Sequence, residues 1–307
     1  MVEQAISIFE DTTSLKYASA IDLGGLIDLD LAQPAQALEP FTRALEIRRA
    51  NPGSDDPSIA YSLNNVALAY TELGELDLAL AARREAILLR LKANSNRIGN
   101  SYSNISSLLL RMGRPEEAEQ SLAKCPALKD FSDETFLSTG NPRFSGDMVL
   151  LSRIRLAQGR LPDALRLASK ALEFRRKLLG NRLKTCDSQH DVASVLLKDG
   201  HIISAMRVLR QLLQDVVGIS ETFVKGHGQR ARALYTLSKA YEARDMLAES
   251  TACKEKAVAL RSLPRPDLKD APFEEEEFSK LCLWMLLSQW LTSAAPTSAV
   301  DKTLPAC

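Results

Sequence analysis

The sequence predicts an all-helical array of about six helix pairs, with one further helix capping the C-terminal end. Three observations in the 307 residues support this fold class. Apolar residues recur at helical spacing, breaks in this pattern recur at intervals of roughly 40 residues, and small residues stand at fixed distances from the breaks. No stretch shows the alternation of β-branched residues that would indicate a strand.

The breaks identify the turn within each helix pair. The clearest case is the segment Tyr61 to Arg90, in which two helical patterns flank Gly74. Equivalent breaks follow one another at spacings of 42, 39, 46, 41 and 45 residues, at Ala32, Gly74, Gly113, Gly159, Gly200 and Asp245. A single pair cannot bury its own apolar face, so we expect consecutive pairs to stack into a solenoid.

Three rows of mostly small residues are aligned on these turns. Seven residues before the turn stand Gly25, Ala67, Ser106, Ser152, Ala193 and Ser238. Five residues after it stand Ala37, Ala79, Ala118, Ala164, Ala205 and Ser250. Twelve residues after it stand Ala44, Ala86, Cys125, Ala171, Leu212 and Ala257. Because antiparallel helices joined by a short turn cross closely, a large side chain at the crossing would force them apart.

Prolines and arginines mark the two ends of the second helix. Pro34, Pro115 and Pro162 come just after their turns, where a missing N–H is harmless because the helix begins there. Sixteen residues after the turn stand Arg48, Arg90, Arg175 and Arg261. We interpret these arginines as C-terminal helix residues whose charge suits the helix dipole, in preference to a nucleic-acid-binding patch.

At these positions the chain resembles the tetratricopeptide-repeat (TPR) family. The family has the three small rows and an aromatic or apolar residue four before the turn, here Tyr70, Leu109, Leu196 and Tyr241. The longer spacing is similar to the variety found in kinesin light chains and in the repeat tails of fungal signalling NTPases. The resemblance covers residues 17–262 and implies a right-handed α-solenoid with a concave, protein-binding face.

Four regions follow from this reading. Residues 1–16 hold an unpaired helix, Val2 to Phe9, which is similar to the second helix of an earlier repeat. Residues 17–262 hold the six repeats, interrupted by a long loop at 126–146 that begins at Pro126. Residues 263–291 hold a proline-rich linker and an amphipathic capping helix from Glu274 to Leu291. Residues 292–307 are small and polar, and we expect them to be disordered.

Composition excludes several classes of function. Lys and Arg total 39, and Asp and Glu also total 39, so the formal net charge is zero. No long-range field therefore attracts nucleic acid or an anionic membrane, and we expect neither as a partner. No apolar run approaches a membrane span, and the N-terminus does not resemble a secretory signal. We expect an intracellular, cytoplasmic protein, because the five cysteines are odd in number and widely spaced.

No arrangement of residues indicates catalysis or a cofactor. The three histidines are His190, His201 and His227. Cys186 and His190 have metal-ligand spacing on a helix, but no second pair accompanies them, so a packing or surface role is favoured and no metal site is predicted. HExxH, GxSxG and GxxxxGK[ST] motifs are absent from the sequence. We therefore predict a protein that is not an enzyme and carries no cofactor.

The resemblance places the candidate binding residues nine and ten before the turn, where the first helices face the groove. The candidates are Asn64, Asn65, Ser103, Asn104, Asp191 and Tyr235. Chaperone-tail binders of the family carry Lys ten before the turn and Asn six before it; this chain has Asn64 and Leu68 there, which disfavours a chaperone adaptor. Asn65 and Asn104 instead resemble the asparagine ladder with which other members hold a peptide backbone. The alternative is that these asparagines simply tolerate an exposed helix position.

Three functions remain open at this stage. The first is a non-catalytic scaffold or adaptor that binds a protein or peptide in the concave groove. The second is a regulatory or sensor repeat tail of a larger signalling protein of the NTPase type, whose catalytic part is absent from this chain. The third is a structural element of an assembly.

Overall fold

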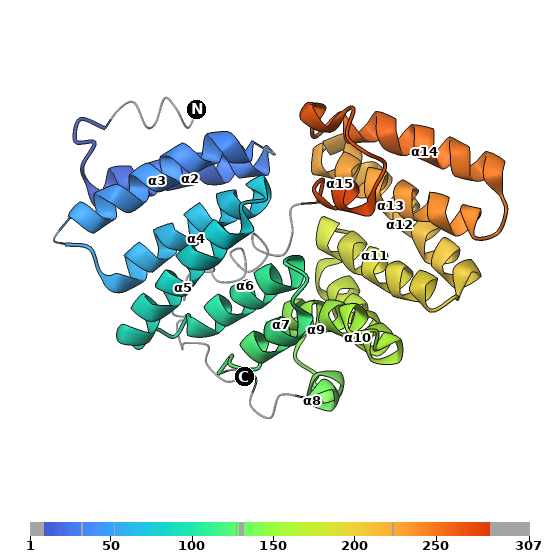
Figure 1. Cartoon of the computed structure of the whole chain (residues 1–307), viewed down its shortest axis with the longest axis horizontal. Coiled ribbons are helices and arrows are strands. Elements are labelled where there is room, and N and C mark those ends of the chain that lie inside the picture. The colour runs from blue at the N-terminus through green and yellow to red at the C-terminus, as the bar shows by residue number, and fades with distance from the viewer. Residues whose placement is uncertain are drawn as a thin grey trace, which may run out of the picture.

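A computed structural model describes residues 9–282, apart from residues 32, 52, 127, 129–131 and 223. This part of the chain is helical and contains no strand, which confirms the predicted all-α class. Twelve of its helices form six consecutive antiparallel pairs (Figure 1). The pairs are α2 (Leu15–Asp30) with α3 (Pro34–Ala50), α4 (Asp56–Leu73) with α5 (Leu76–Lys92), α6 (Ile98–Arg111) with α7 (Pro115–Leu122), α9 (Ser145–Ala157) with α10 (Leu161–Leu179), α11 (Leu183–Lys198) with α12 (Ile202–Thr222), and α13 (Val224–Glu242) with α14 (Leu247–Arg261).

The predicted turns are the points at which the backbone enters the left-handed region. Gly74 ends α4 with φ 84°, and Gly113, Gly159 and Gly200 have φ between 72° and 77°. Asp245 takes the same conformation with φ 57°, although it carries a side chain. Asp tolerates this region better than most residues because its short polar side chain can bond locally. The predicted turn at Ala32 lies outside the described residues.

The small rows form the crossing point of each pair, as predicted. Every described residue of the rows five and twelve after the turn is at least nine-tenths buried. In two pairs the crossing is closed by a hydrogen bond between the rows. Ser106 donates its hydroxyl to the carbonyl of Ala118 over 2.6 Å, and Ser152 donates to that of Ala164 over 2.7 Å. In the first pair, a Cβ on Gly25 would lie 2.7 Å from the ring of Phe41, so only glycine fits.

The arginine row joins consecutive pairs, which goes beyond the dipole role expected from the sequence. These side chains are buried, and Arg48, Arg90 and Arg175 each reach the first helix of the next pair. Arg48 bonds to Ser62, Arg90 to Ser101, and Arg175 to Ser188 over 2.9 Å. All three serines stand twelve residues before their turn. The row therefore fixes the stacking of the first, second and fourth pairs on their successors by a repeated buried contact.

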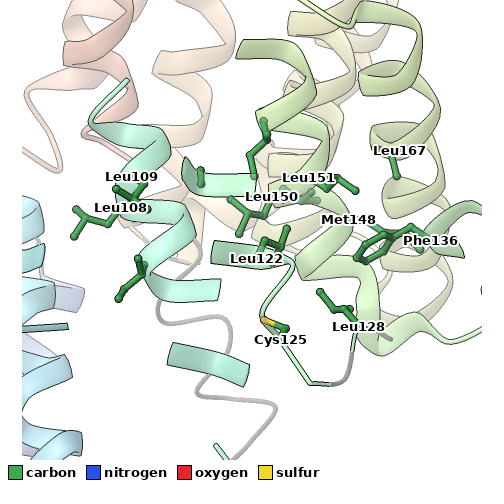
Figure 2. Close-up of a cluster of buried hydrophobic side chains, with 14 of the residues drawn as sticks. Leu108, Leu109, Leu122, Cys125, Leu128, Phe136, Met148, Leu150, Leu151 and Leu167 are labelled. Carbon is green, nitrogen blue, oxygen red and sulfur yellow. The ribbon is translucent and has the colours of Figure 1, made fainter. Parts of the chain in front are cut away.

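Between α7 and α9 the chain is not a bare loop but includes a helical turn. Helix α8 (Asp133–Ser138) and the 3-10 helix η1 (Pro142–Phe144) lie in the segment predicted as the long loop. Phe136 is 3% exposed and meets Phe144 edge-on at 6.2 Å between ring centroids. Figure 2 shows Phe136 beside Met148 in the core shared by the third and fourth pairs.

After α14 the chain turns back onto the array. It passes through η2 (Pro266–Leu268) and α15 (Glu275–Ser279), which lies against α13 on the side facing the N-terminal half (Figure 1). The capping helix is predicted to run from Glu274 to Leu291, whereas α15 ends at Ser279. Beyond α15, the backbone of Leu281 packs directly against Gly228 of α13. A Cβ on Gly228 would lie 2.4 Å from the carbonyl oxygen of Leu281. The expected continuation to Leu291 lies outside the described residues.

The remaining sequence expectations concern the two ends of the chain. The unpaired helix predicted from Val2 to Phe9 falls almost entirely outside the described residues, and Phe9 itself is not helical. The tail predicted to be disordered, 292–307, is also outside them. None of the helices that the structure describes is both long and apolar enough to span a membrane.

Candidate functional site

The inner side of the array encloses a cavity of about 570 Å³ between its two halves. One wall comes from α4, α5 and α6, the opposite wall from α9 and α11, and α15 borders it on the C-terminal side. On the first helices, its lining residues stand two, three, five and six residues before the turn. They are Thr71, Glu72, Ser107, Leu108, Leu110, Arg111, Arg153, Leu156, Ala157 and Lys198, joined by Arg83, Glu275, Ser279 and Lys280 from other elements.

The first two candidate residues lie between helices. Asn64 is 2% exposed and donates its amide to the carbonyl of Ala60 in its own helix over 2.5 Å. Asn65 is fully buried and donates to Asp22 of α2 over 2.9 Å. Burial raises the pKa of the Asp22 carboxyl despite the guanidinium of Arg48 beside it. The donor of Asn65 is thus already used in joining two first helices.

Ser103 and Asn104 lie on α6, the first helix of the third pair. Both are buried, and the hydroxyl of Ser103 donates to the carboxylate of Asp147 in α9 over 3.0 Å. Burial raises the pKa of Asp147 to about 6, with the Ser103 hydrogen bond opposing the shift. This position ten residues before the turn therefore joins α6 to α9.

Asp191 belongs to a charge cluster that joins three first helices. Arg153 of α9 donates to Asp191 over 2.7 Å and to Asp187 over 3.1 Å. Arg232 of α13 donates to Asp187 over 2.6 Å. Although burial opposes it, the guanidiniums of Arg153 and Arg232 lower the pKa of Asp187, whereas burial raises the pKa of Asp191. Paired charges thus join these helices where an apolar contact could have done so. Removing one partner alone would be destabilising, because it would leave a buried charge without its counterion.

The pair with metal-ligand spacing is part of this inner layer. Burial lowers the pKa of His190 well below its usual range, so its imidazole is neutral, and Nε2 lies 2.9 Å from the hydroxyl of Thr236. Cys186 is fully buried, and burial raises the pKa of its thiol to about 12. Across residues 9–282, as far as they are described, no group of three His, Cys, Asp or Glu side chains is placed to hold a metal ion.

Tyr235, the last candidate, is covered by the chain's own C-terminal segment. Its ring stacks on Phe278 at 4.8 Å between centroids and meets Phe273 at 5.0 Å. Tyr235 is 8% exposed, and Phe278 is fully buried. This stretch of the inner face is therefore occupied in the structure.

The six candidates predicted from the sequence and the lining of the cavity occupy different rows of the first helices. None of the six candidates lines the cavity; residues two, three, five and six before the turn do so. The rows nine and ten before the turn lie deeper, where consecutive first helices bond to each other. Their charged partners Asp22, Asp147 and Arg153 are visible in the sequence, but they stand ten, twelve and six residues before their turns and so form no common row.

Comparison with known proteins identifies the repeats. Family models of the tetratricopeptide repeat match residues 17–92, 58–128 and 150–182. The chain belongs to the tetratricopeptide-repeat family. Among curated proteins, none matches the sequence.

Several solved structures have the same fold at low sequence identity. The apo form of RapI is 14% identical with a TM-score of 0.63, over 86% of this chain and 89% of that one. The Rap conjugation gene regulator of plasmid pLS20, in complex with the Phr peptide, is 16% identical with a TM-score of 0.62, over 88% and 69%. Repeats of a Podosopora anserina protein described as a kinesin light chain are 18% identical with a TM-score of 0.51, over 69% and 100%. These similarities concern the fold alone.

Proposed function

We propose that this protein is a non-catalytic scaffold that binds an extended protein segment in the central cavity. The observation that carries the proposal is the cavity itself, about 570 Å³ in volume and lined by helices from four of the six pairs. Its lining combines apolar side chains such as Leu108 and Leu156 with hydroxyls and charges, the mixture that suits peptide side chains and backbone together. A regulator with the same fold was solved with a peptide bound, which supports this use of the architecture.

The inner charged groups support a structural role rather than a catalytic one. Arg153, Asp187, Asp191 and Arg232 neutralise one another through short, buried bonds. His190 is held neutral by burial, and the thiol of Cys125 has its pKa raised to about 11 by burial. A nucleophile or general base needs a pKa near the working pH and access to substrate. These groups are instead held in one protonation state inside the helix packing.

Blocking the cavity tests the proposal. Ala157 is exposed and lines the cavity, so Ala157→Trp should fill part of it without entering the core. Ala81 is an exposed alanine of α5 that does not line it, which makes Ala81→Trp the matched control. A partner captured by the unmodified protein from cell extract, identified by mass spectrometry, should bind Ala157→Trp at least 10-fold more weakly, as steric exclusion implies. Equal capture by both variants, with unchanged melting, would show that binding does not use the cavity.

For the six candidates identified in the sequence, direct contact with a peptide stays a prediction. Asn104 is the better test of the asparagine ladder, because the amide of Asn65 already donates to Asp22. With the partner in hand, Asn104→Ala should weaken binding by roughly 2- to 10-fold if its amide pairs with the peptide backbone. Unchanged affinity would remove it from the site.

A further inference from the structure

Arg83 occupies a position that the other repeats reserve for the core. It stands nine residues after its turn, and the equivalent residues in four other pairs are apolar or small and fully buried: Phe41, Leu122, Ala168 and Leu209. The sixth equivalent is Lys254, whose side chain is 39% exposed. Arg83 is only 1% exposed. A guanidinium has therefore been placed where packing calls for a hydrocarbon.

The guanidinium of Arg83 has no partner within the described residues. None of its three nitrogens makes a hydrogen bond, and it forms no ion pair there. Other buried arginines have partners. Arg48 pairs with Asp22, Arg153 pairs with Asp191, and Arg261 donates hydrogen bonds to three backbone carbonyls. Burial lowers the pKa of Arg83 to about 9, and repulsion from Arg90 adds to this. An unpaired buried cation is destabilising, so a bound anion would relieve a cost already present in the free protein.

Arg83 borders the cavity rather than a closed part of the core. Thr71 of α4 and Ser107 of α6 line the cavity with it. The hydroxyl of Thr71 is directed to its own helix, where it donates to the carbonyl of Ala67 over 2.6 Å. The guanidinium nitrogens are buried at the edge of the cavity, so a group entering it would reach them through a displacement of the lining side chains of α4 and α6.

The remaining charges of the cavity leave an excess of positive charge. Arg111 pairs with Glu72 at 3.4 Å, Arg153 pairs with Asp191, and Lys280 pairs with Glu277. Among the described lining residues, Arg83, Lys198 and Glu275 are left without an ion pair, which gives two cations against one carboxylate. The cavity is thus suited to a ligand that carries negative charge.

We propose that Arg83 anchors an oxyanion-binding subsite within the cavity, for a carboxylate or phosphate group carried by the bound protein segment. The planar fork of a guanidinium matches two oxygens of either group, which a single ammonium does not. This proposal rests on the proposed function for its natural ligand. It differs from the chaperone-tail clamp, because Arg83 comes from the second helix of a pair and lies in a row whose other buried members, Phe41, Leu122, Ala168 and Leu209, are apolar.

The test measures melting temperature in acetate, phosphate and chloride at equal ionic strength, for the unmodified protein, Arg83→Met and Arg84→Met. Arg84 is the exposed neighbour on the same helix and serves as the matched control. In chloride, Arg83→Met should melt higher than the unmodified protein, because methionine fills the apolar row without a charge. A saturating anion should raise the melting temperature of the unmodified protein and of Arg84→Met by about 2–6 °C, and leave Arg83→Met unchanged.

Comparing acetate with phosphate shows which kind of anionic group the subsite prefers. A response to acetate alone indicates a carboxylate site, and a response to phosphate alone indicates a phosphate site. Either response supports the subsite if Arg83→Met abolishes it. The same response in Arg83→Met, or no response in the unmodified protein, would overturn the proposal.

A second measurement does not depend on the variant folding. In the unmodified protein, the Nε–H NMR signal of Arg83 should shift on titration with the active anion and saturate, whereas that of exposed Arg84 should not. Because the probes are simple anions and need no protein partner, this result does not depend on whether the proposed scaffold function is correct. If Ala157→Trp keeps full partner binding while Arg83 still responds to anions, the proposed function fails and the subsite stands. Once a partner is known, Arg83→Met should weaken its binding by roughly 10- to 100-fold.

Discussion

Three junctions inside the array and the free end of the array use the same arginine row with different partners. Inside, Arg48, Arg90 and Arg175 reach a serine hydroxyl on the first helix of the next pair. After α14, where the described residues hold no further helix pair, Arg261 donates instead to the carbonyls of Lys269, Ala271 and Pro272. The ring of Phe278 covers its guanidinium at 5.1 Å.

The difference shows what a repeat array needs at its end. The last pair does not need another helix pair, but it does need acceptors for a buried cation and apolar cover for the exposed face. The segment after α14 supplies both with irregular backbone and one short helix. That segment also covers Tyr235 on the inner face, so the end of the array and the edge of the cavity are built from the same residues.

The largest effect should come from removing this segment. A chain that stops at Leu263 would leave Arg261 buried without its three acceptors and would expose Tyr235 and its neighbours in the core. We expect a loss of about 5 kcal/mol or more, seen as aggregation or as melting about 10 °C lower or more. Thermal denaturation followed by circular dichroism measures this.

The full-length variant Arg261→Met separates the two contributions of the segment. It removes the cation but keeps the apolar cover, so its loss should be clearly smaller than that of the truncation. A soluble truncated chain with unchanged melting would contradict the capping role. It would show that the segment can leave the inner face, as a displaceable occupant of the cavity edge would.

A smaller loss of stability should distinguish the junctions formed by Arg48 and Arg90 inside the array. Arg48 is paired with the carboxylate of Asp22, and their side chains are 6% and 1% exposed. Arg48→Met would leave that carboxylate buried without its cation and should cost about 3–5 kcal/mol. Arg90 has Ser101 as its partner and no carboxylate, so Arg90→Met should cost only about 1–2 kcal/mol. Urea unfolding of both variants measures the difference.

The double variant Arg48→Met with Asp22→Asn supplies the control for this comparison. Removing both charges should restore most of the stability lost in Arg48→Met, because the cost lies in the uncompensated carboxylate. Equal losses in the two single variants would mean that the carboxylate adds nothing to the first junction.

The sequence predicts the fold far better than the site, for a physical reason. The crossing of two helices within a pair is a local contact at fixed spacing, so its small rows and left-handed turns repeat and can be aligned. The contacts of Asn65 with Asp22, and of Ser103 with Asp147, join residues 43 and 44 positions apart and differ at each junction. Neither follows from the pattern of one repeat. Arg83 is partly an exception: the sequence shows a charge at this row in two repeats, Arg83 and Lys254, but only the structure shows that Arg83 is the buried one.

The smallest effect should appear at the junction between the third and fourth pairs, where the sixteenth position after the turn lies outside the described residues. Here Asp147, in the first turn of α9, accepts the hydroxyl of Ser103. Its pKa is raised by burial from 3.8 to about 6, so the folded protein binds an extra proton between these values. Stability should therefore fall as pH rises from about 4 to about 6, and the deficit should be fully present above that range.

Asp147→Asn tests this assignment, because asparagine keeps an acceptor for Ser103 and cannot ionise. The pKa difference corresponds to about 3 kcal/mol at most, and loss of the favourable helix dipole offsets about 0.3–1 kcal/mol. We expect the variant to be about 1–2 kcal/mol more stable at pH 7 and equally stable at pH 4, by urea unfolding at both values. Asp163→Asn, in the first turn of α10 where Asp163 pairs with Arg160, should instead lose a little stability at pH 7. If Asp147→Asn is less stable than the unmodified protein at pH 7, the carboxylate strengthens this junction, and the third junction relies on charge as the first one does.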